Sequence, residues 1–400
     1  MSALFNPARL MAVAQERTGL SDFGDLSFRR PLAMLCASLH EEAPLTEKGR
    51  EAHAERLIAC LCERLALNDW VRRFPEITEE PLAPPVVIAG LPRTGTTMLY
   101  RMLAAADGLA SPLFYEAAQV SPAPDWDFTV ANDARIPAAE QRVAAMMEAM
   151  PDLASIYPFE AMAPEESIFL YGPSFLTTSQ QSSALVPSYD GWFASADKRP
   201  AYRYLKLTVQ FLQWQRRRSG RWTEGERWLL KTPDHLHGLE ELLDVFPGAR
   251  IIQTHRDPVK TIPSICSFIH VLHQPTTARD DAKDIGAAWS RMFADSMTRA
   301  IAVRDRNPGS FLDIWYRDTV ASPRRVAEEV FAFIGQPLTE QGWEEMQRWR
   351  DANKREARPS HHYTLEEFGL DVEGIETLFR DYRDRFIVPA GVAHSQAAAA

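Results

Sequence analysis

Residues 86–106 combine three local patterns that few folds accommodate in direct succession. Val86–Ala89 is a short apolar run rich in β-branched residues, typical of a strand buried in a parallel sheet. The turn segment Gly90-Leu91-Pro92-Arg93-Thr94-Gly95-Thr96-Thr97 follows, and Thr96–Ala106 has the apolar spacing of a helix. A turn between strand and helix directs backbone N–H groups and the positive end of the helix dipole toward one point. The segment therefore predicts an α/β fold with an anion-binding loop.

The same alternation of strand and helix patterns returns in the second half of the chain. Strands are predicted at Trp228–Lys231, Ala249–Thr254 and Phe311–Tyr316. Helices are predicted at 235–246 with Asp234 as N-cap, at 258–272, at 282–305, and from Ser322-Pro323 to Gly335. Repeated strand–helix units predict a parallel sheet flanked by helices, of the P-loop nucleotide-binding type.

The length of the chain, 400 residues, exceeds what a single hydrophobic core usually serves. We expect an N-terminal helical region at residues 1–85, an α/β core at 86–345, and a C-terminal helical segment and tail at 346–400. Within the core, residues 120–225 are expected to form an inserted helical cap. This stretch is rich in methionine and aromatic residues, which usually form helix core but also line adaptable apolar pockets.

Composition excludes several classes of protein. With 44 basic and 54 acidic residues the net charge is -10, the wrong sign for a protein whose main partner is nucleic acid. Four cysteines form no disulfide framework, so reduced thiols and a cytoplasmic location are expected. No stretch approaches the ~20 apolar residues of a membrane span, and the first residues lack a leader pattern, so neither an integral membrane span nor export is expected. The sequence leaves the oligomeric state open.

The turn segment differs from the P-loop of nucleotide triphosphatases at one decisive position. Both glycines and the last hydroxyl of GxxxxGK[ST] are present, but Thr96 occupies the lysine position. The charge that would reach the β- and γ-phosphates of ATP is absent there, which disfavours phosphoryl transfer from ATP. Arg93 supplies a charge inside the loop instead, and a guanidinium can bind a phosphate or sulfuryl group in bidentate fashion.

A second polar cluster, Gln253–Ser264, follows the strand predicted at 249–254. Ligands of open α/β sheets bind at such carboxyl ends of strands. Arg256 lies at the end of the strand and Ser264 on the helix that follows, so both side chains can reach one phosphate. The alternative is that Arg256 pairs with Asp257 or another acid and that Ser264 is a solvated helix residue.

Together the two clusters resemble sulfotransferases that depend on 3′-phosphoadenosine-5′-phosphosulfate (PAPS). Gly90–Thr97 is similar to their 5′-phosphosulfate loop in the bacterial form Pro-Arg-x-Gly-Thr-Thr, and the Arg256…Ser264 pair is similar to their 3′-phosphate site. Leu229–Pro233 resembles the family's Lys-Thr element, and the segment from Tyr316 to Gly335 resembles its Tyr-x-Asp…Pro segment. The large helical insertion fits the bacterial branch of the family.

The resemblance implies transfer of a sulfuryl group from PAPS to a hydroxyl of an apolar or amphipathic small molecule, such as a phenol, sterol or glycolipid. No metal is implied, and the nucleotide product is 3′-phosphoadenosine 5′-phosphate (PAP). Arg93 and Lys231 are assigned to the charge that develops on the transferred group. The residues implied in donor binding are Pro92, Arg93, Thr94, Gly95, Thr96, Thr97, Arg256 and Ser264.

Three residues are candidates for the base that accepts the acceptor proton, because Pro233 stands where the cytosolic members have a histidine. Glu166 is the first choice; Pro164-Glu165-Glu166 is expected to open a helix of the cap, where acids also simply complement the helix dipole. His235 is the second, although it can equally cap a helix or pair with Asp234. Glu116 is the third, and a surface salt bridge explains it as well.

Two other functions stay open at this point. One is a P-loop kinase or nucleotide hydrolase, against which Thr96 counts; the other is a catalytically silent nucleotide-binding protein that keeps the loop and lacks the base. A basic stretch, 354–362, lies where the family has a basic segment over the 3′-phosphate. It lacks the family's Arg-Lys-Gly form, so a solvated loop is expected.

Overall fold

The structure is a computed structural model and describes residues 3–130, 133–153, 157, 159–353 and 363–391. The chain divides into two compact units. The first unit contains residues 1–83, 112–226 and 271–280, and the second contains 84–111, 227–270 and 281–400. The basic stretch 354–362 lies outside the described residues. The division into three regions expected from the sequence stays a prediction.

The second unit contains a five-stranded parallel sheet in the order β2-β3-β1-β4-β5. The strands are β1 Val86–Gly90, β2 Leu109–Ala110, β3 Arg227–Lys231, β4 Arg250–His255 and β5 Phe311–Trp315. The predicted parallel sheet flanked by helices is confirmed. Strand β2 was not predicted, because two residues carry no readable alternation.

The register of the sheet brings the carboxyl ends of three strands to one edge. Gly90 of β1 lies opposite Thr254 of β4, and Ile88 lies opposite both Ile252 and Lys231 of the flanking strands. The loop after β1, the end of β3 and the cluster after β4 therefore start from the same edge. This edge is where open parallel sheets bind their ligands.

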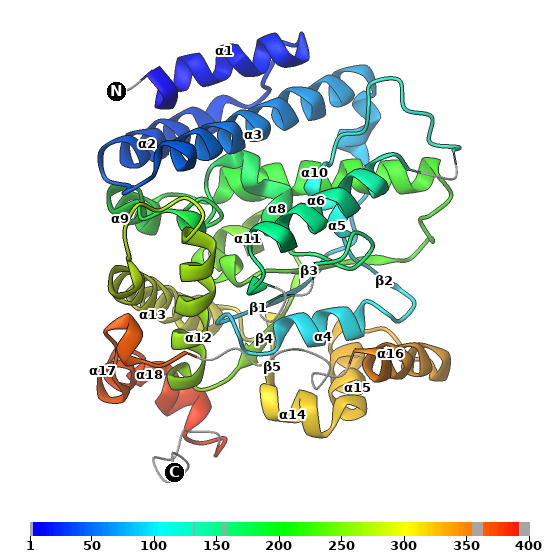
Figure 1. Cartoon of the computed structure of the whole chain (residues 1–400). Coiled ribbons are helices and arrows are strands. Elements are labelled where there is room, and N and C mark those ends of the chain that lie inside the picture. The colour runs from blue at the N-terminus through cyan, green and yellow to red at the C-terminus, as the bar shows by residue number, and fades with distance from the viewer. Residues whose placement is uncertain (1–2, 131–132, 154–156, 158, 354–362, 392–400) are drawn as a thin grey trace. The chain divides into compact units, whose positions relative to one another are not determined.

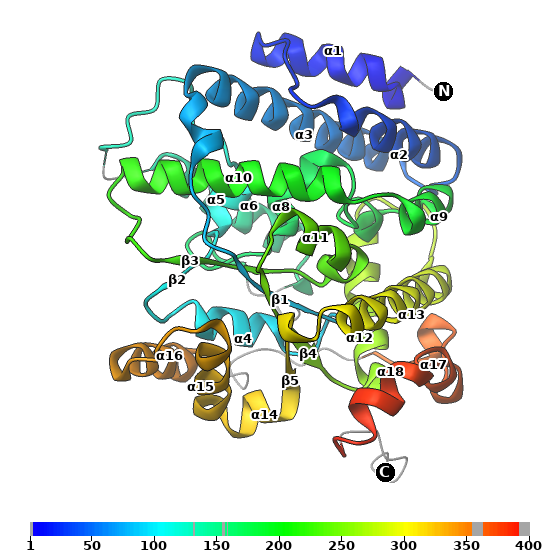
Figure 2. The same cartoon turned by 180° about the vertical axis from the view of Figure 1, so that it is seen from behind.

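Helices cover the sheet of the second unit. In both views α4, α15 and α16 lie on one side of β4 and β5 and α13 lies on the other (Figures 1 and 2). Apolar side chains of β1, β3, β4 and β5 pack against α4, α15 and α16, and Gln253 on the opposite face contacts Met297 of α13. The helices are α4 Thr96–Leu103, α11 Leu239–Val245, α12 Pro258–His273, α13 Ala282–Arg306, α14 Tyr316–Ala321, α15 Pro323–Ile334, α16 Glu340–Ala352, α17 Val372–Leu378 and α18 Arg380–Tyr382, with the short turns η6 Pro233–His237, η7 Pro308–Ser310, η9 Glu366–Phe368 and η10 Arg383–Ile387. The last three residues of α12 belong to the first unit.

The helix predicted at 235–246 with Asp234 as N-cap is wrong in its first half. Thr232 is the cap, since its side chain accepts a hydrogen bond from the Asp234 N–H, and a 3₁₀ turn begins at Pro233. Gly238 then ends the 3₁₀ turn, and the α-helix begins only at Leu239. Proline fixes the first turn and glycine weakens helix continuity, which together shorten the helix.

The first unit is helical throughout its described elements. Helices α1, α2 and α3 lie alongside one another in both views (Figures 1 and 2) and share an apolar core with α9. The helices are α1 Pro7–Thr18, α2 Arg29–Glu41, α3 Glu47–Arg73, α5 Phe114–Ala118, α6 Arg135–Ala149, α8 Ile168–Tyr171, α9 Pro187–Ser195 and α10 Arg199–Arg218, with 3₁₀ turns η1 Ala3–Phe5, η2 Leu26–Phe28, η3 Pro75–Glu79, η4 Gly172–Ser174 and η5 Gln181–Ser183.

Many aromatic residues of the stretch 120–225 serve as ordinary core. Tyr171, Phe175, Tyr189 and Phe193 are each 1% exposed or less.

All four cysteines are free thiols. Among the described residues, no helix combines the length and apolar character needed to cross a membrane.

Candidate active site

The fold brings the two predicted anion-binding clusters into direct contact. The Arg93 Nε donates a hydrogen bond to the Ser264 hydroxyl at 3.1 Å. The Arg256 guanidinium donates to the backbone oxygen of Arg93 at 3.0 Å. The loop after β1 and the cluster after β4 thus form one site within the second unit, although about 160 residues separate them in sequence.

The backbone of the loop adopts left-handed conformations at two positions. Arg93 has φ +66°, which is uncommon for a residue with a side chain, and Gly95 has φ +83° as the N-cap of α4. A Cβ at Gly95 would lie 2.6 Å from Cδ2 of Tyr316. The loop therefore needs glycine at position 95 for both its torsion angle and its packing.

The hydroxyl of Thr94 is engaged within the protein. It donates to the Leu91 carbonyl oxygen at 2.7 Å and lies 2.6 Å from the Thr254 hydroxyl oxygen. Thr94 is 1% exposed, and Pro92 and Thr96 are buried beside it. Thr94 thus fixes the shape of the loop, whereas Thr96 begins α4, where the first backbone N–H groups have no partner within the helix.

Lys231 reaches the loop from the end of β3. Its side chain is buried, and its Nζ donates to the Thr97 hydroxyl at 3.2 Å. The Nζ also lies 5.6 Å from the centre of the Tyr100 ring. Arg93, Lys231 and Arg256 therefore bring three cationic groups to the loop, a set whose chemistry suits a ligand with several anionic groups.

Tyr316, the first residue of α14, is a site residue that the sequence analysis did not single out. The Arg256 guanidinium carbon lies 4.3 Å from the centre of its ring, and the same ring packs against Gly95. Its place in the Tyr-x-Asp segment was noted, but its contact with two other segments depends on the fold.

His235 belongs to the second unit and lies in η6, four residues after Lys231. Its side chain is fully buried, and burial lowers the pKa of the imidazole to about 3. The ring is therefore neutral at physiological pH and resists protonation in this environment.

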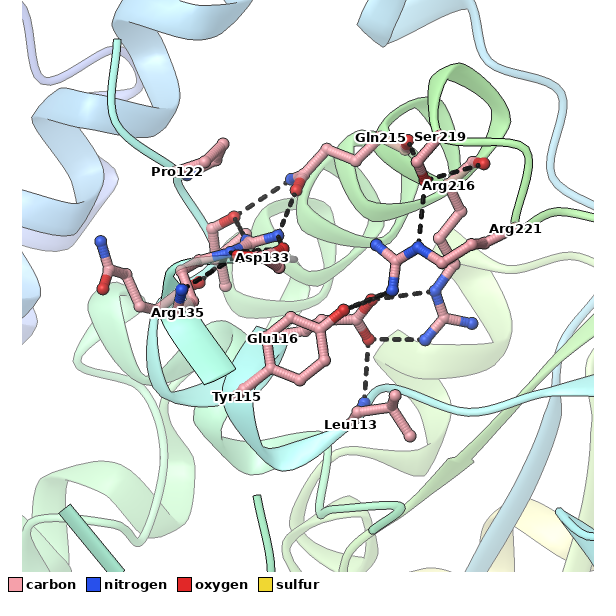
Figure 3. Close-up of polar contacts among 12 residues, drawn as sticks. Leu113, Tyr115, Glu116, Pro122, Asp133, Arg135, Gln215, Arg216, Ser219 and Arg221 are labelled. Atoms are coloured by element: carbon pink, nitrogen blue, oxygen red, sulfur yellow. Dashed lines mark hydrogen bonds and ion pairs between the residues drawn. The ribbon is translucent and has the colours of Figure 1, made fainter. Parts of the chain in front are cut away.

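Glu116 belongs to the first unit and forms a buried ion pair with Arg216 (Figure 3). Arg216 Nε donates to Oε1 at 3.0 Å and Nη2 donates to Oε2 at 2.5 Å, while the Leu113 N–H donates to Oε2 at 3.0 Å. Burial raises the pKa of Glu116, but the guanidinium outweighs burial and holds the pKa below its usual range. The expected surface salt bridge is thus a buried one, with Glu116 only 1% exposed.

Further polar groups extend this pair into a network (Figure 3). Arg135 donates to the Asp133 carboxylate at 2.7 Å and to Gln215 Oε1 at 3.0 Å. The Arg221 guanidinium donates to the Tyr115 hydroxyl and lies 3.9 Å from Glu116. The network joins α5, α6 and α10 inside the first unit.

Glu166 also belongs to the first unit, but no helix begins at Pro164. Pro164 forms a β-bridge with Leu113, and α8 starts only at Ile168. The neighbouring Glu165 is fully buried; its Oε1 accepts hydrogen bonds from the Tyr157 hydroxyl at 2.6 Å and from the Glu166 N–H at 2.8 Å. These contacts fix the Glu165 carboxylate against the backbone of the next residue, and Glu166 itself stays partly exposed.

The residues around Glu166 include exposed apolar side chains. Met162 is 53% exposed and Phe169 is 38% exposed. The Phe169 ring meets the Phe114 ring at a centroid distance of 6.4 Å, and Phe114 in turn contacts Phe159. Met162 and Phe169 thus expose apolar area in the same segment as the partly exposed Glu166, whereas Phe114 is buried.

Residues 84–340 match the profile of the sulfotransferase family, so the chain belongs to this family of enzymes. The omega-hydroxy-beta-dihydromenaquinone-9 sulfotransferases Stf3 of Mycobacterium bovis and Mycobacterium tuberculosis are each 25% identical to it over 276 residues. That match spans 63% of this chain and 63% of the length of each relative.

Two crystal structures resemble the whole chain. Sulfotransferase STF9 from Mycobacterium avium has a TM-score of 0.85 and 26% identity, over 97% of this chain and 98% of that one. Sulfotransferase STF1 from Mycobacterium tuberculosis H37Rv has a TM-score of 0.81 and 25% identity, over 94% and 98% of the two chains. The predicted family and fold are confirmed.

Proposed function

We propose that the chain transfers a sulfuryl group from PAPS to a hydroxyl of an apolar or amphipathic small molecule, without a metal. The observation that carries the proposal is the contact of Arg93 with both Ser264 and Arg256. It joins the loop that resembles a 5′-phosphosulfate site to the pair that resembles a 3′-phosphate site. A donor with anionic groups at both ends of its ribose needs such a double site.

The chemistry of the residues present fits this donor. The α4 N-terminus with Gly95, Thr96 and Thr97 would receive the 5′ end, because backbone N–H groups and the helix dipole favour anions there. Arg256 and Ser264 would hold the 3′-phosphate. When bound, PAPS supplies the sulfuryl group that passes to the acceptor oxygen.

Arg93 and Lys231 would stabilise the negative charge that develops during transfer. Their buried or partly buried setting strengthens such interactions relative to water. Thr97, which accepts a hydrogen bond from Lys231, would keep the ammonium group directed at the loop. Pro92 would keep the loop in shape, and so would Thr94, whose hydroxyl contacts Leu91 and Thr254 rather than the ligand.

Glu166 remains the proposed base, for reasons that come from the environments of all three candidates. Both oxygens of Glu116 are bound by Arg216, and burial makes His235 hard to protonate. Glu166 is partly exposed in the same segment as the exposed Met162 and Phe169, which suits a base for an apolar alcohol. It would take the proton of the acceptor hydroxyl.

The acceptor class follows from the surface around Glu166. Met162 and Phe169 expose apolar area there, which suits an apolar acceptor with a hydroxyl end. The Stf3 relatives are named for a hydroxylated menaquinone, a molecule of this kind. We therefore propose hydroxylated isoprenoid or aromatic lipids as the first acceptors to test.

The test is transfer of radiolabelled sulfate from PAPS, in EDTA, to a panel of hydroxylated quinones, phenols and sterols. We expect a sulfated product with wild-type protein and none with Arg93→Ala, which should still fold. Magnesium-dependent ATP turnover would instead support a P-loop kinase or hydrolase. Tight PAP binding without transfer to any acceptor would support a catalytically silent nucleotide-binding protein.

A further inference from the structure

The residue before Arg256 is anchored by the C-terminal part of the second unit. His255 ends β4 and is fully buried. Its Nε2 lies 2.8 Å from Asp313 Oδ1 on β5, and its Nδ1 lies 3.1 Å from the Tyr382 hydroxyl. The imidazole also stacks on Phe386 at a centroid distance of 4.7 Å. Residues of α18 and η10 thus fix the backbone at the C-terminal end of β4.

The Tyr382 hydroxyl links this anchor to Arg256 itself. The hydroxyl contacts His255, and the nearby Arg256 backbone N–H partly offsets the rise that burial causes in the pKa of Tyr382. The ionised Asp313 carboxylate can only accept, so the neutral imidazole donates to it from Nε2, and Nδ1 accepts from the Tyr382 hydroxyl. Arg304 completes the chain by binding Asp313 in bidentate fashion at 2.7 and 2.8 Å.

The residue after Arg256 is anchored by the same C-terminal segment. Arg383 Nη1 pairs with the carboxylate of Asp257, and its Nη2 donates to Glu376 at 2.7 Å. Asp257 Oδ1 also accepts from the Val259 N–H in the first turn of α12. Both members of the Arg383–Asp257 pair are at least nine-tenths buried. The pair therefore fixes the start of the helix that carries Ser264.

We propose that Tyr382 and Arg383 are positioning residues for the donor's 3′-phosphate. They hold the backbone on both sides of Arg256, so that its guanidinium lies between the Tyr316 ring and the Arg93 carbonyl oxygen. The inference rests on the proposed role of Arg256 and extends it to a segment more than 120 residues away in sequence. Neither Tyr382 nor Arg383 is assigned a contact with the donor.

The test measures PAP binding to the full chain by calorimetry, with adenosine 5′-phosphate as a ligand that lacks the 3′-phosphate. Tyr382→Phe and Arg383→Gln should each weaken PAP binding about tenfold, as expected for members of one contact network, and change adenosine 5′-phosphate binding less than about twofold. Steady-state kinetics should show a higher KM for PAPS with kcat nearly unchanged.

Arg385→Gln is the matched control. Arg385 lies in the same π-helical turn and also pairs with a carboxylate, Asp305, but neither residue touches 255–257. It should leave PAP binding unchanged. Arg256→Ala provides the second control: once this guanidinium is absent, Arg383→Gln should cause no further loss of PAP affinity.

The outcomes separate the inference from the proposed function. If Arg256→Ala weakens PAP binding but Tyr382→Phe and Arg383→Gln do not, the positioning role is refuted and the donor site stands. If the two variants lower affinity for both nucleotides equally, or still lower PAP affinity when Arg256 is alanine, they act on the fold in general and the inference fails. If Arg256→Ala leaves PAP affinity unchanged, the proposed donor site itself is wrong.

Discussion

Replacing Glu116 with glutamine tests whether this carboxylate has a structural role or a catalytic one. The substitution keeps the shape of the side chain but removes the charge that faces Arg216 across a pair whose side chains are 1% and 9% exposed. Removing one partner of a buried ion pair typically costs about 3–5 kcal/mol, because the other charge stays buried. In a unit of roughly 150–250 residues each kcal/mol lowers Tm by about 2–4 °C, so Glu116→Gln should lower Tm by about 6–20 °C.

The assay combines thermal unfolding with sulfotransfer at a temperature where the variant is folded. Because the carboxylate is occupied by Arg216, kcat should stay within about threefold of wild type. Glu166→Gln should behave in the opposite way: its side chain is partly exposed, so Tm should move by less than about 2 °C, while loss of general-base catalysis should lower kcat by about 10²–10⁴-fold. A Glu116→Gln enzyme with normal Tm and abolished turnover would refute this reasoning and make Glu116 the base.

Three further predictions concern single positions. Burial lowers the pKa of His235 to about 3, so between pH 6.5 and 3 the unfolded state takes up a proton that the folded state does not. Lowering the pH from 8 to 5 should therefore cost about 2 kcal/mol of the free energy of unfolding through His235 alone, and His235→Gln should remove that part of the slope in denaturant titrations. Gly95→Ala should weaken PAP binding about tenfold or more, because the added Cβ would clash with the Tyr316 ring and because φ +83° strains a residue with a side chain. Unchanged affinity in calorimetry would contradict this. Arg93→Lys keeps the charge but loses the Nε bond to Ser264, so KM for PAPS should rise about fivefold or more in steady-state assays.

Much of the second unit could be predicted from local patterns. The runs at 86–90 and 228–231 are apolar and short, and Gly90, Pro258 and Gly335 mark the ends or beginnings of elements, so strand and helix patterns were readable. The meeting of the loop with Arg256 followed from a general property of parallel sheets, whose carboxyl ends share one edge. Thr364-Leu365-Glu366-Glu367 has the residue pattern of a capping box, and both of its reciprocal hydrogen bonds are present in the structure.

The rest depends on contacts between segments far apart in sequence. Nothing near Glu116 in sequence indicates Arg216, one hundred residues away, so a surface salt bridge was the natural expectation. Arg383 looks like one of several basic residues of an amphipathic tail until the fold places it against Asp257. The sequence suggested a helix N-terminus before Glu166, but the backbone there is set by Glu165 instead. The buried Glu165 carboxylate needs hydrogen-bond donors and accepts one from the Glu166 N–H. Such pairings carry no local periodicity.

The most direct test of the central claim is the stabilisation of the wild-type chain by nucleotides. A ligand that binds only the native state adds about 2.7 kcal/mol at a hundredfold excess over Kd, which a thermal-shift titration detects easily. The proposed double site predicts selective stabilisation by PAP over AMP and ATP, with no dependence on magnesium. Equal shifts with all three nucleotides, or a preference for ATP with magnesium, would contradict it.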